Sequence, residues 1–178
     1  IISRAGAYAQ MGQNDSALAD YNKVKVMFPK YATLYYKIGL VYDQMLETEQ
    51  AILAYNKAIS LDSSKAEFYF NRGFDFDELN KNENALKDYS RAIQLNPLYT
   101  DAYFNRAYIC DEMENYEAAI LDYCRVISLE SDAADAYFNR GLTKAALGRH
   151  SASCDDILKA AELGDKTAKE YYKLNCNQ

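Results

Sequence analysis

The segment Ala102-Tyr103-Phe104-Asn105-Arg106 returns further along the chain as Ala136-Tyr137-Phe138-Asn139-Arg140, and a variant, Phe68-Tyr69-Phe70-Asn71-Arg72, precedes it at the same offset. The offset is thirty-four residues, and the whole chain can be divided into units of this length without insertion or deletion. The division gives an incomplete unit 1–31, four full units 32–65, 66–99, 100–133 and 134–167, and a tail 168–178. Self-similarity at a fixed period of this size is the signature of a repeat architecture. The sequence therefore predicts one array of tandem repeats over residues 1–178.

Each unit has the pattern of two helices. In unit 100–133, Tyr103, Ala107 and Cys110 fall on one face of a helix expected over 101–114. Apolar residues at helical spacing continue over 116–129 after a short polar turn. We therefore expect an all-α chain of antiparallel helix-turn-helix repeats.

Small and large residues recur at fixed places of the unit, counted so that residue 32 is place one. The eighth place is small (Ala5, Gly39, Gly73, Ala107, Gly141), as is the twentieth (Ala17, Ala51, Ala85, Ala119, Ser153). The twenty-fourth is large (Tyr21, Tyr55, Tyr89, Tyr123, Ile157). Small residues let two helices approach closely, and the large one fills the space that its neighbour leaves.

This pattern resembles the tetratricopeptide repeat family, over nearly the whole chain. The shared features are the length of the unit, the three places above, a small twenty-seventh place, and a proline at the thirty-second place in two units (Pro29, Pro97). Two places depart from the family: tyrosine replaces the usual tryptophan at place four, and arginine replaces the usual leucine at place seven. The resemblance implies a right-handed α-solenoid, a superhelix whose first helices line a concave channel for a partner peptide.

Several function classes fit the composition poorly. The net charge of −6 disfavours nucleic acid and anionic membrane as partners, and there is no apolar run of the ~20 residues that span a bilayer. The only histidine is His150, so a histidine metal pair cannot be assembled, and there is no nucleophile elbow of the kind that accompanies many catalytic triads. There is no glycine-rich phosphate loop. We expect a chain that is not an enzyme and uses no cofactor and no metal.

The four cysteines are Cys110, Cys124, Cys154 and Cys176, and none forms a CxxC motif. Cys154 and Cys176 lie nearly equidistant from the Gly164-Asp165 turn, so a helical hairpin would place them opposite each other. Free packed thiols are the favoured expectation and a disulfide is the alternative. Free thiols would suit a soluble cytoplasmic protein, and a disulfide would point to an exported one.

Two further places on the first helices are candidates for partner binding. The fifth place is aromatic (Tyr36, Phe70, Phe104, Phe138), and could hold apolar partner side chains or touch the neighbouring repeat. The sixth place carries a ladder of asparagines (Asn71, Asn105, Asn139). An amide can pair with a partner's peptide groups without reading its side chains, as a similar ladder does in sugar-transferase relatives of the family. The alternative is an amide that bonds its own array.

Acidic residues dominate the remaining inner places. The second place carries Glu67, Asp101 and Asp135, and places twelve and thirteen carry Asp43, Asp77, Glu78, Asp111 and Glu112. Lys37 is the only base at these places and place six. The lysine clamp with which one family subclass grips acidic chaperone tails is therefore missing. We expect a basic partner segment, with solubility as the alternative reason for the acids.

Arginine and aspartate occur together at places seven and twenty-three. The unit with Ile38 in place of the arginine also has Ala54 in place of the aspartate. We therefore expect one ion pair within each other hairpin: Arg4–Asp20, Arg72–Asp88, Arg106–Asp122 and Arg140–Asp156. These arginines would be structural and would not bind anions.

The two ends of the array differ. The tail carries an apolar stripe (Ala168, Tyr171, Tyr172, Leu174) and is expected to form a capping helix over 168–178. The first unit starts at its fourth place, which suggests a fragment or processed form of a longer protein. An incomplete end could also stack on another copy, so a self-associating or purely architectural array is the alternative to a peptide-binding adaptor.

Overall fold

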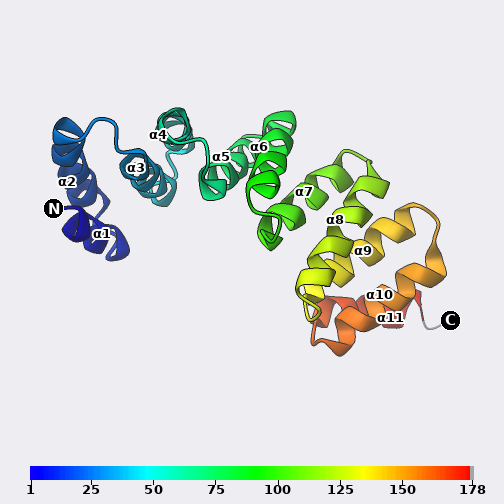
Figure 1. Cartoon of the computed structure of the whole chain (residues 1–178). Coiled ribbons are helices and arrows are strands. Elements are labelled where there is room, and N and C mark those ends of the chain that lie inside the picture. The colour runs from blue at the N-terminus through cyan, green and yellow to red at the C-terminus, as the bar shows by residue number, and fades with distance from the viewer. Residues whose placement is uncertain (177–178) are drawn as a thin grey trace. The chain divides into compact units, whose positions relative to one another are not determined.

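The computed structural model describes residues 1–176, which form eleven α-helices and no strand (Figure 1). Their bounds are α1 Ile2–Gln10, α2 Asn14–Met27, α3 Ala32–Gln44, α4 Thr48–Leu61, α5 Ala66–Glu78, α6 Asn82–Leu95, α7 Thr100–Glu112, α8 Tyr116–Leu129, α9 Ala134–Ala146, α10 His150–Glu162 and α11 Lys166–Asn175. The expected all-α chain of helix-turn-helix repeats is confirmed.

The helices recur with the period of the sequence. Helices α3, α5, α7 and α9 begin one repeat length apart, at Ala32, Ala66, Thr100 and Ala134, and α4, α6, α8 and α10 keep the same spacing. Each first helix packs antiparallel on the helix that follows it, and the tight turn between them uses one residue with positive φ. That residue is Gly12 or Gly148 in two hairpins and Leu46, Asn80 or Glu114 in the others. A left-handed residue just past a helix end satisfies the last free carbonyls.

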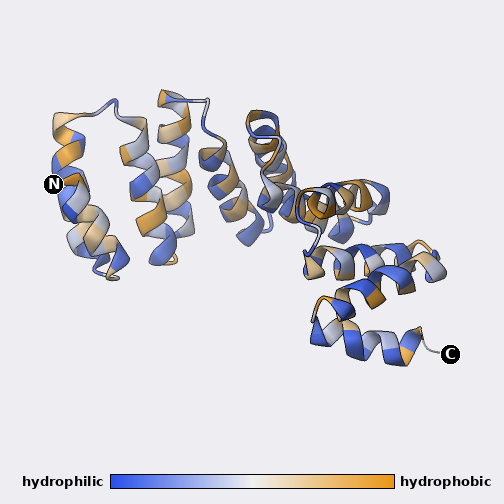
Figure 2. Cartoon of the chain, turned by 60° about the horizontal axis from the view of Figure 1, so that its bottom comes forward, coloured by the Kyte–Doolittle hydropathy of each residue, from blue (hydrophilic) through white to orange (hydrophobic). Residues whose placement is uncertain are grey.

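The helices cluster into two compact units, α1–α6 in residues 1–96 and α7–α11 from residue 97 onward. In the first compact unit Tyr21, Tyr55 and Tyr89 are fully buried, and in the second Tyr123 and Ile157 are. Tyr55, Tyr89 and Ile157 lie against the glycine at place eight of their own hairpins. Most helices carry both hydrophobic and hydrophilic residues, as Figure 2 shows, which is the pattern of helices buried on one side.

The contact between Gly39 and Tyr55 is tight enough to give a testable result. A Cβ on Gly39 would lie 2.5 Å from the Tyr55 ring, whereas one on Gly73 would lie 3.1 Å from Tyr89. Alanine gains about 1 kcal/mol of helix propensity over glycine, but overpacking costs roughly 1–3 kcal/mol. We expect Gly39→Ala to lower the free energy of unfolding and Gly73→Ala to lower it less, measured by urea denaturation. A stabilised Gly39→Ala variant would show that Tyr55 moves freely.

The tail helix α11 packs on α10 through Ala168, Tyr171 and Tyr172. Its first turn is capped by Asp165, whose Oδ1 accepts a hydrogen bond from the Ala168 amide at 3.0 Å. The helix begins two residues before the expected range 168–178. The last two residues of that range lie outside the described part of the chain.

A disulfide joins Cys154 of α10 to Cys176 at the end of α11, with an S–S distance of 1.99 Å and a Cα–Cα distance of 5.6 Å. The favoured expectation of free thiols at these two positions is therefore wrong, and the alternative of a bond holds. The reason is geometric, because α11 folds back along α10 and brings the two Cα atoms within the usual range for a disulfide. Cys110 and Cys124 are free, the first buried and the second exposed.

Candidate functional site

The ion pairs expected between the two helices of each hairpin are all confirmed. In every case the arginine Nε and Nη2 donate to the two carboxylate oxygens in a bidentate fork, at 2.6–2.9 Å. The pairs are Arg4–Asp20, Arg72–Asp88, Arg106–Asp122 and Arg140–Asp156. Their aspartate side chains are at most 10% exposed, so these four ion pairs are partly buried. They are called the clamps below.

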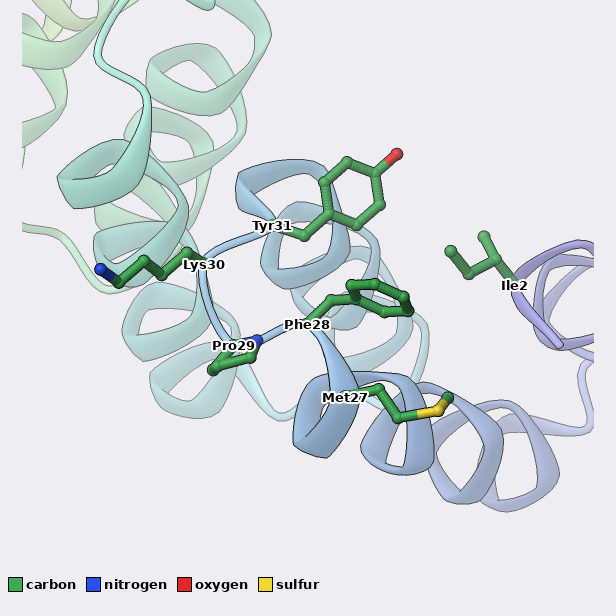
Figure 3. A pocket seen from close by; sticks show the side chains of 6 residues that line it. All are labelled: Ile2, Met27, Phe28, Pro29, Lys30 and Tyr31. Atoms are coloured by element: carbon green, nitrogen blue, oxygen red, sulfur yellow. The ribbon is translucent and has the colours of Figure 1, made fainter.

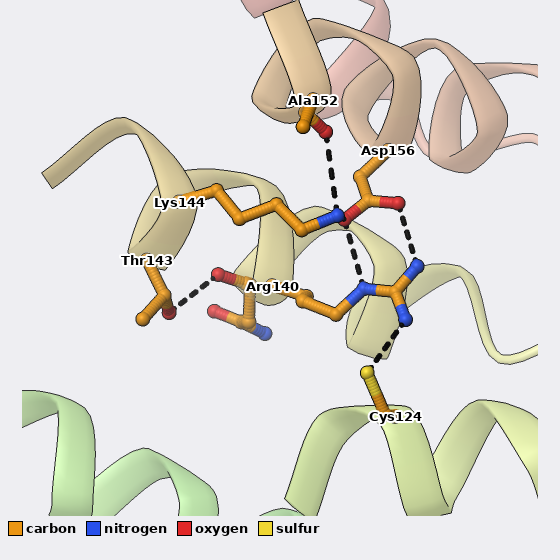
Figure 4. A network of polar contacts seen from close by, with 7 residues as sticks. Cys124, Arg140, Thr143, Lys144, Ala152 and Asp156 are labelled. Carbon is orange, nitrogen blue, oxygen red and sulfur yellow. Dashed lines mark hydrogen bonds and ion pairs between the residues drawn. The ribbon is translucent and has the colours of Figure 1, made fainter. Parts of the chain in front are cut away.

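The third nitrogen of the guanidinium links a hairpin to the one before it. Arg72 Nη1 donates to Asn56 Oδ1 at 2.6 Å, and Arg140 Nη1 to Cys124 Sγ at 3.0 Å (Figure 4). Asn56 and Cys124 occupy the same place, the twenty-fifth, of their units. These arginines are thus fully engaged within the protein, which supports the expectation that they do not serve as anion-binding groups.

The two departures from the family pattern belong together. The guanidinium at place seven lies over the tyrosine ring at place four, at 5.7 Å for Arg72 and Tyr69 and 5.5 Å for Arg140 and Tyr137. Cation–π contacts of this kind add to the clamp. The sequence showed both departures but not that each supports the other.

The clamps also shift the pKa values of the residues that form them. Hydrogen bonds from Arg4 and Lys23 lower the pKa of Asp20 to about 2. Hydrogen bonding to the paired carboxylate raises the pKa of Arg106 and of Arg140. Asp156 has a second cation, because Lys144 Nζ lies 2.7 Å from its Oδ2 (Figure 4).

The aromatic residues at place five are all half-buried. Phe70 and Phe104 contact the buried tyrosine of their own hairpin, with ring centroids 5.7 Å from Tyr89 and 5.6 Å from Tyr123. Phe138 contacts Tyr171 of α11 at 6.1 Å. Each ring is thus anchored by part of its surface and leaves the remainder accessible.

The asparagine ladder uses its donors internally. The Nδ2 groups of Asn71 and Asn139 donate to the carbonyls of Glu67 and Asp135, one turn earlier, both at 2.8 Å. Asn71 Nδ2 also donates to the Tyr36 hydroxyl at 3.1 Å. The amide oxygens of Asn71 and Asn139 accept no hydrogen bond from residues 1–176. Asn105 is half-buried and also has an interaction within the protein.

The expected acidic places lie on the first helices of their hairpins. Glu67, Glu78, Asp101, Glu112 and Asp135 are exposed, and Asp43, Asp77 and Asp111 are half-buried. At place twelve, Asp43 Oδ2 accepts a short hydrogen bond from the Tyr55 hydroxyl. Asp111 Oδ1 is enclosed without a hydrogen-bond partner in the described part of the chain.

One acid was missed in the sequence. Asp75 on α5 is 4% exposed, at a place where three other units carry the buried Val41, Ile109 and Thr143. Burial, and then the nearby Asp43 on α3, raise the pKa of Asp75 to about 8. Burial also raises the pKa of Asp43. The sequence did contain a signal for this, because Asp75 is the only acid at its place, which holds buried residues in three other units.

An apolar hollow of about 720 Å³ lies in the first compact unit, beside the start of α1 and the α2–α3 connection (Figure 3). It is lined by Ile2, Met27, Phe28, Pro29, Lys30 and Tyr31. Met27, Phe28 and Tyr31 are 54%, 59% and 43% exposed, which is high for large hydrophobic side chains.

Within residues 1–176, no three acidic, cysteine or histidine side chains are grouped so that they could hold a metal ion. No helix of that range has the length and apolar character needed to cross a membrane.

Hairpins that recur at a strict period, each joined by an ion pair in all but one unit, define a helical-repeat protein. Comparison with known families identifies which kind of repeat it is. The TPR repeat model matches residues 6–45, 47–74, 76–113 and 108–148, and a second tetratricopeptide repeat model matches residues 134–163. The chain belongs to the tetratricopeptide repeat (TPR) family. It is a protein–protein interaction module of a family that is typically non-catalytic.

Solved structures agree with this assignment. A crystal structure of MamA is 28% identical with a TM-score of 0.86, over 93% of this chain and 96% of that one. YrrB, described as a TPR protein with an unusual peptide-binding site, is 24% identical with a TM-score of 0.86, over 97% and 90%. MamA from Desulfovibrio magneticus RS-1 shares the fold at 15% identity, with a TM-score of 0.84 over 90% and 91%. A search of curated proteins finds no match.

Proposed function

We propose that the chain is an adaptor that binds an extended, basic segment of a partner protein along the first helices of its hairpins. Places two, five, six, nine, twelve and thirteen of a unit share one helix face, because they follow a spacing of three and four. The observation that carries the proposal is the chemistry of that face, where half-buried aromatic rings alternate with exposed and half-buried carboxylates.

The charge of this face favours a cation in each compact unit taken by itself. In the first, Glu67, Asp77 and Glu78 stand against one base, Lys37, and in the second the corresponding places carry Asp101, Asp111, Glu112 and Asp135. The nearby arginines do not offset these charges, because the clamps already neutralise them. A surface lined by one sign of charge attracts the opposite charge and speeds its arrival at low salt.

The remaining groups of the face supply backbone and apolar contacts. The unused amide oxygens of Asn71 and Asn139 can accept a hydrogen bond from a partner's peptide N–H, which requires no particular side chain. Phe70, Phe104 and Phe138 offer ring surface to apolar partner side chains. YrrB has the same fold and is described as having a peptide-binding site, which makes peptide binding a reasonable proposal for this chain.

Charge reversal on this face should abolish binding. The probe is a fluorescein-labelled peptide of alternating lysine and leucine, and its glutamate–leucine counterpart is the control peptide. We expect the basic peptide to bind and the acidic control peptide not to bind. The affinity for the basic peptide should fall as salt rises from low to physiological. The Asp77→Lys, Asp111→Lys variant should bind the basic peptide at least tenfold more weakly than the wild type does. Fluorescence anisotropy measures all three results.

A matched control separates local from overall charge. Asp15 and Asp155 are exposed acids, one in each compact unit, on the second helices α2 and α10. The Asp15→Lys, Asp155→Lys variant therefore has the same net charge as the test variant, and we expect it to retain most of the affinity. Equal losses in both variants, or tight binding of the acidic peptide, would contradict the proposal.

Self-association is a second candidate, supported by the apolar hollow and the exposed Met27, Phe28 and Tyr31 beside it. A second copy covering this surface would remove it from water. Light scattering over a dilution series distinguishes the candidates, because only self-association makes the mass depend on concentration.

The disulfide supports a place of action in an oxidising compartment. Such bonds persist in secreted, periplasmic or lumenal proteins and are rare in the reducing cytosol of mesophiles. Because the Cys154–Cys176 disulfide is present, we propose that this chain is exported.

A further inference from the structure

The buried acid Asp75 replaces a core residue. Its place is filled by the apolar Val41 and Ile109 in two other units, and in a third by Thr143, whose hydroxyl is satisfied by the Asn139 carbonyl at 2.8 Å. An ionised Asp75 cannot make such a bond, because a carboxylate has no proton to donate to the corresponding carbonyl of Asn71, and its Oδ2 is enclosed without a hydrogen-bond partner among the described residues. A buried carboxylate without a partner is costly, so the group is stable there only when it is neutral or paired.

The neighbour of Asp75 is another carboxyl group. Asp43, on α3 of the preceding hairpin, lies near enough to Asp75 for each carboxyl group to shift the pKa of the other. Its Oδ2 accepts a hydrogen bond from the Tyr55 hydroxyl, and its Oδ1 is enclosed without a hydrogen-bond partner among the described residues. Two carboxylates cannot hydrogen-bond to each other, because neither has a donor. One proton shared between them supplies the missing donor and satisfies both groups.

Among residues 1–176, no cation pairs with either carboxyl group in place of that proton. The elements packed around Asp75 present Asp43 and Tyr36 from α3, Tyr55 from α4 and Glu78 from α5 itself. From α6, Asp88 and Tyr89 approach α5 at Gly73, and Asp88 is already neutralised by Arg72. None of the ion pairs within residues 1–176 includes Asp43 or Asp75.

We propose that the proton shared by Asp43 and Asp75 is a pH-operated latch between the hairpins α3–α4 and α5–α6. While the proton is bound, a carboxyl–carboxylate hydrogen bond ties α3 to α5. When it leaves, two like charges face each other in a dry contact, which lowers the barrier to opening and admits water. The latch does not depend on what the protein binds.

The direction of the pH effect follows from the protons bound in each state. The pKa of Asp75 is raised by burial in the closed state, to about 8, and returns toward about 4 once the contact opens to water. The closed state therefore binds more protons between these two values, so rising pH favours opening. The opening equilibrium constant should increase by up to about tenfold per pH unit in this window and level off above it.

Hydrogen exchange of the intact chain between pH 5.5 and 8.5, corrected for the intrinsic rate of exchange, tests this effect. We expect protection of α3 and α5 to fall severalfold per pH unit, while protection of α8 and α9 stays constant. Asp75→Asn keeps the shape, and its amide can still donate to Asp43, so protection in that variant should not vary with pH. Asp111→Asn is the matched control: Asp111 holds the place of Asp43, but the next hairpin presents Thr143, so the wild-type profile should remain.

A second measurement keeps the test decisive if Asp75→Asn folds poorly. The carboxyl ¹³C shift of Asp75 in the wild-type chain should show a neutral acid at pH 6 and an ionised one well above pH 8. An Asp75 that is already ionised at pH 6, or a pH dependence of α3 and α5 that Asp75→Asn leaves intact, would overturn the latch.

Discussion

Replacing Arg72 by isoleucine, with Asp88 left in place, is expected to lower the free energy of unfolding by roughly 3–5 kcal/mol. The Asp88 side chain is only 7% exposed, so it would be left charged, enclosed and without its bidentate partner. Asp88→Ala should cost a similar amount, because it strands the guanidinium of Arg72, which is 18% exposed. Urea unfolding of the intact chain measures both losses, and native-state hydrogen exchange assigns them to α5 and α6.

The double variant Arg72→Ile, Asp88→Ala should recover most of the loss, to within about 1 kcal/mol of the wild type. The chain itself supplies the precedent, since the neighbouring unit carries Ile38 and Ala54 at the same two places, both buried. A double-mutant cycle therefore separates an unpaired charge from lost packing. Additive losses in the double variant would mean that the clamp stabilises only through its aliphatic contacts.

Tyr55→Ala is expected to destabilise the first compact unit by roughly 3–5 kcal/mol, because it empties the space that a fully buried ring fills. That ring lies against Gly39, so the opposing helix has no side chain that could relax into the cavity. The same change also removes the donor to Asp43 Oδ2. Thermal and urea unfolding both measure the loss.

Tyr55→Phe is the matched control, since it keeps the ring and deletes the hydroxyl. It should cost about 1–3 kcal/mol, the usual penalty for leaving a buried hydrogen-bond partner unsatisfied. An equal effect of the two substitutions would mean that the ring contributes no packing energy. A neutral Tyr55→Phe would instead mean that water replaces the hydroxyl at Asp43.

The hairpins and their clamps were predictable from the sequence for a clear reason. Because the period is strict, the five units can be aligned place by place. A substitution in one unit can then be compared with the same place in the other four. The unit with Ile38 and Ala54 showed in this way that arginine and aspartate act as a pair. Helix starts spaced by one repeat length and four bidentate ion pairs confirm both predictions.

Contacts between successive hairpins were harder to predict. Asp75 stands out as an acid at a core place, but its meeting with Asp43 depends on how α3 and α5 pack, which periodicity does not specify. The disulfide is similar, because equal spacing from a turn brings Cys154 and Cys176 to one side without setting their distance. The asparagine ladder was recognised, but the donors of Asn71 and Asn139 are taken up by the preceding turn of the same helix.

Selection of peptides from a random library by the intact chain tests the adaptor proposal most directly. We expect enriched segments to carry lysine or arginine interspersed with leucine, isoleucine or aromatic residues, and the Asp77→Lys, Asp111→Lys variant to lose this enrichment. The Asp15→Lys, Asp155→Lys variant should keep it. Enrichment of acidic C-terminal peptides, or no enrichment from a chain whose mass grows with concentration, would contradict a face built for a basic partner.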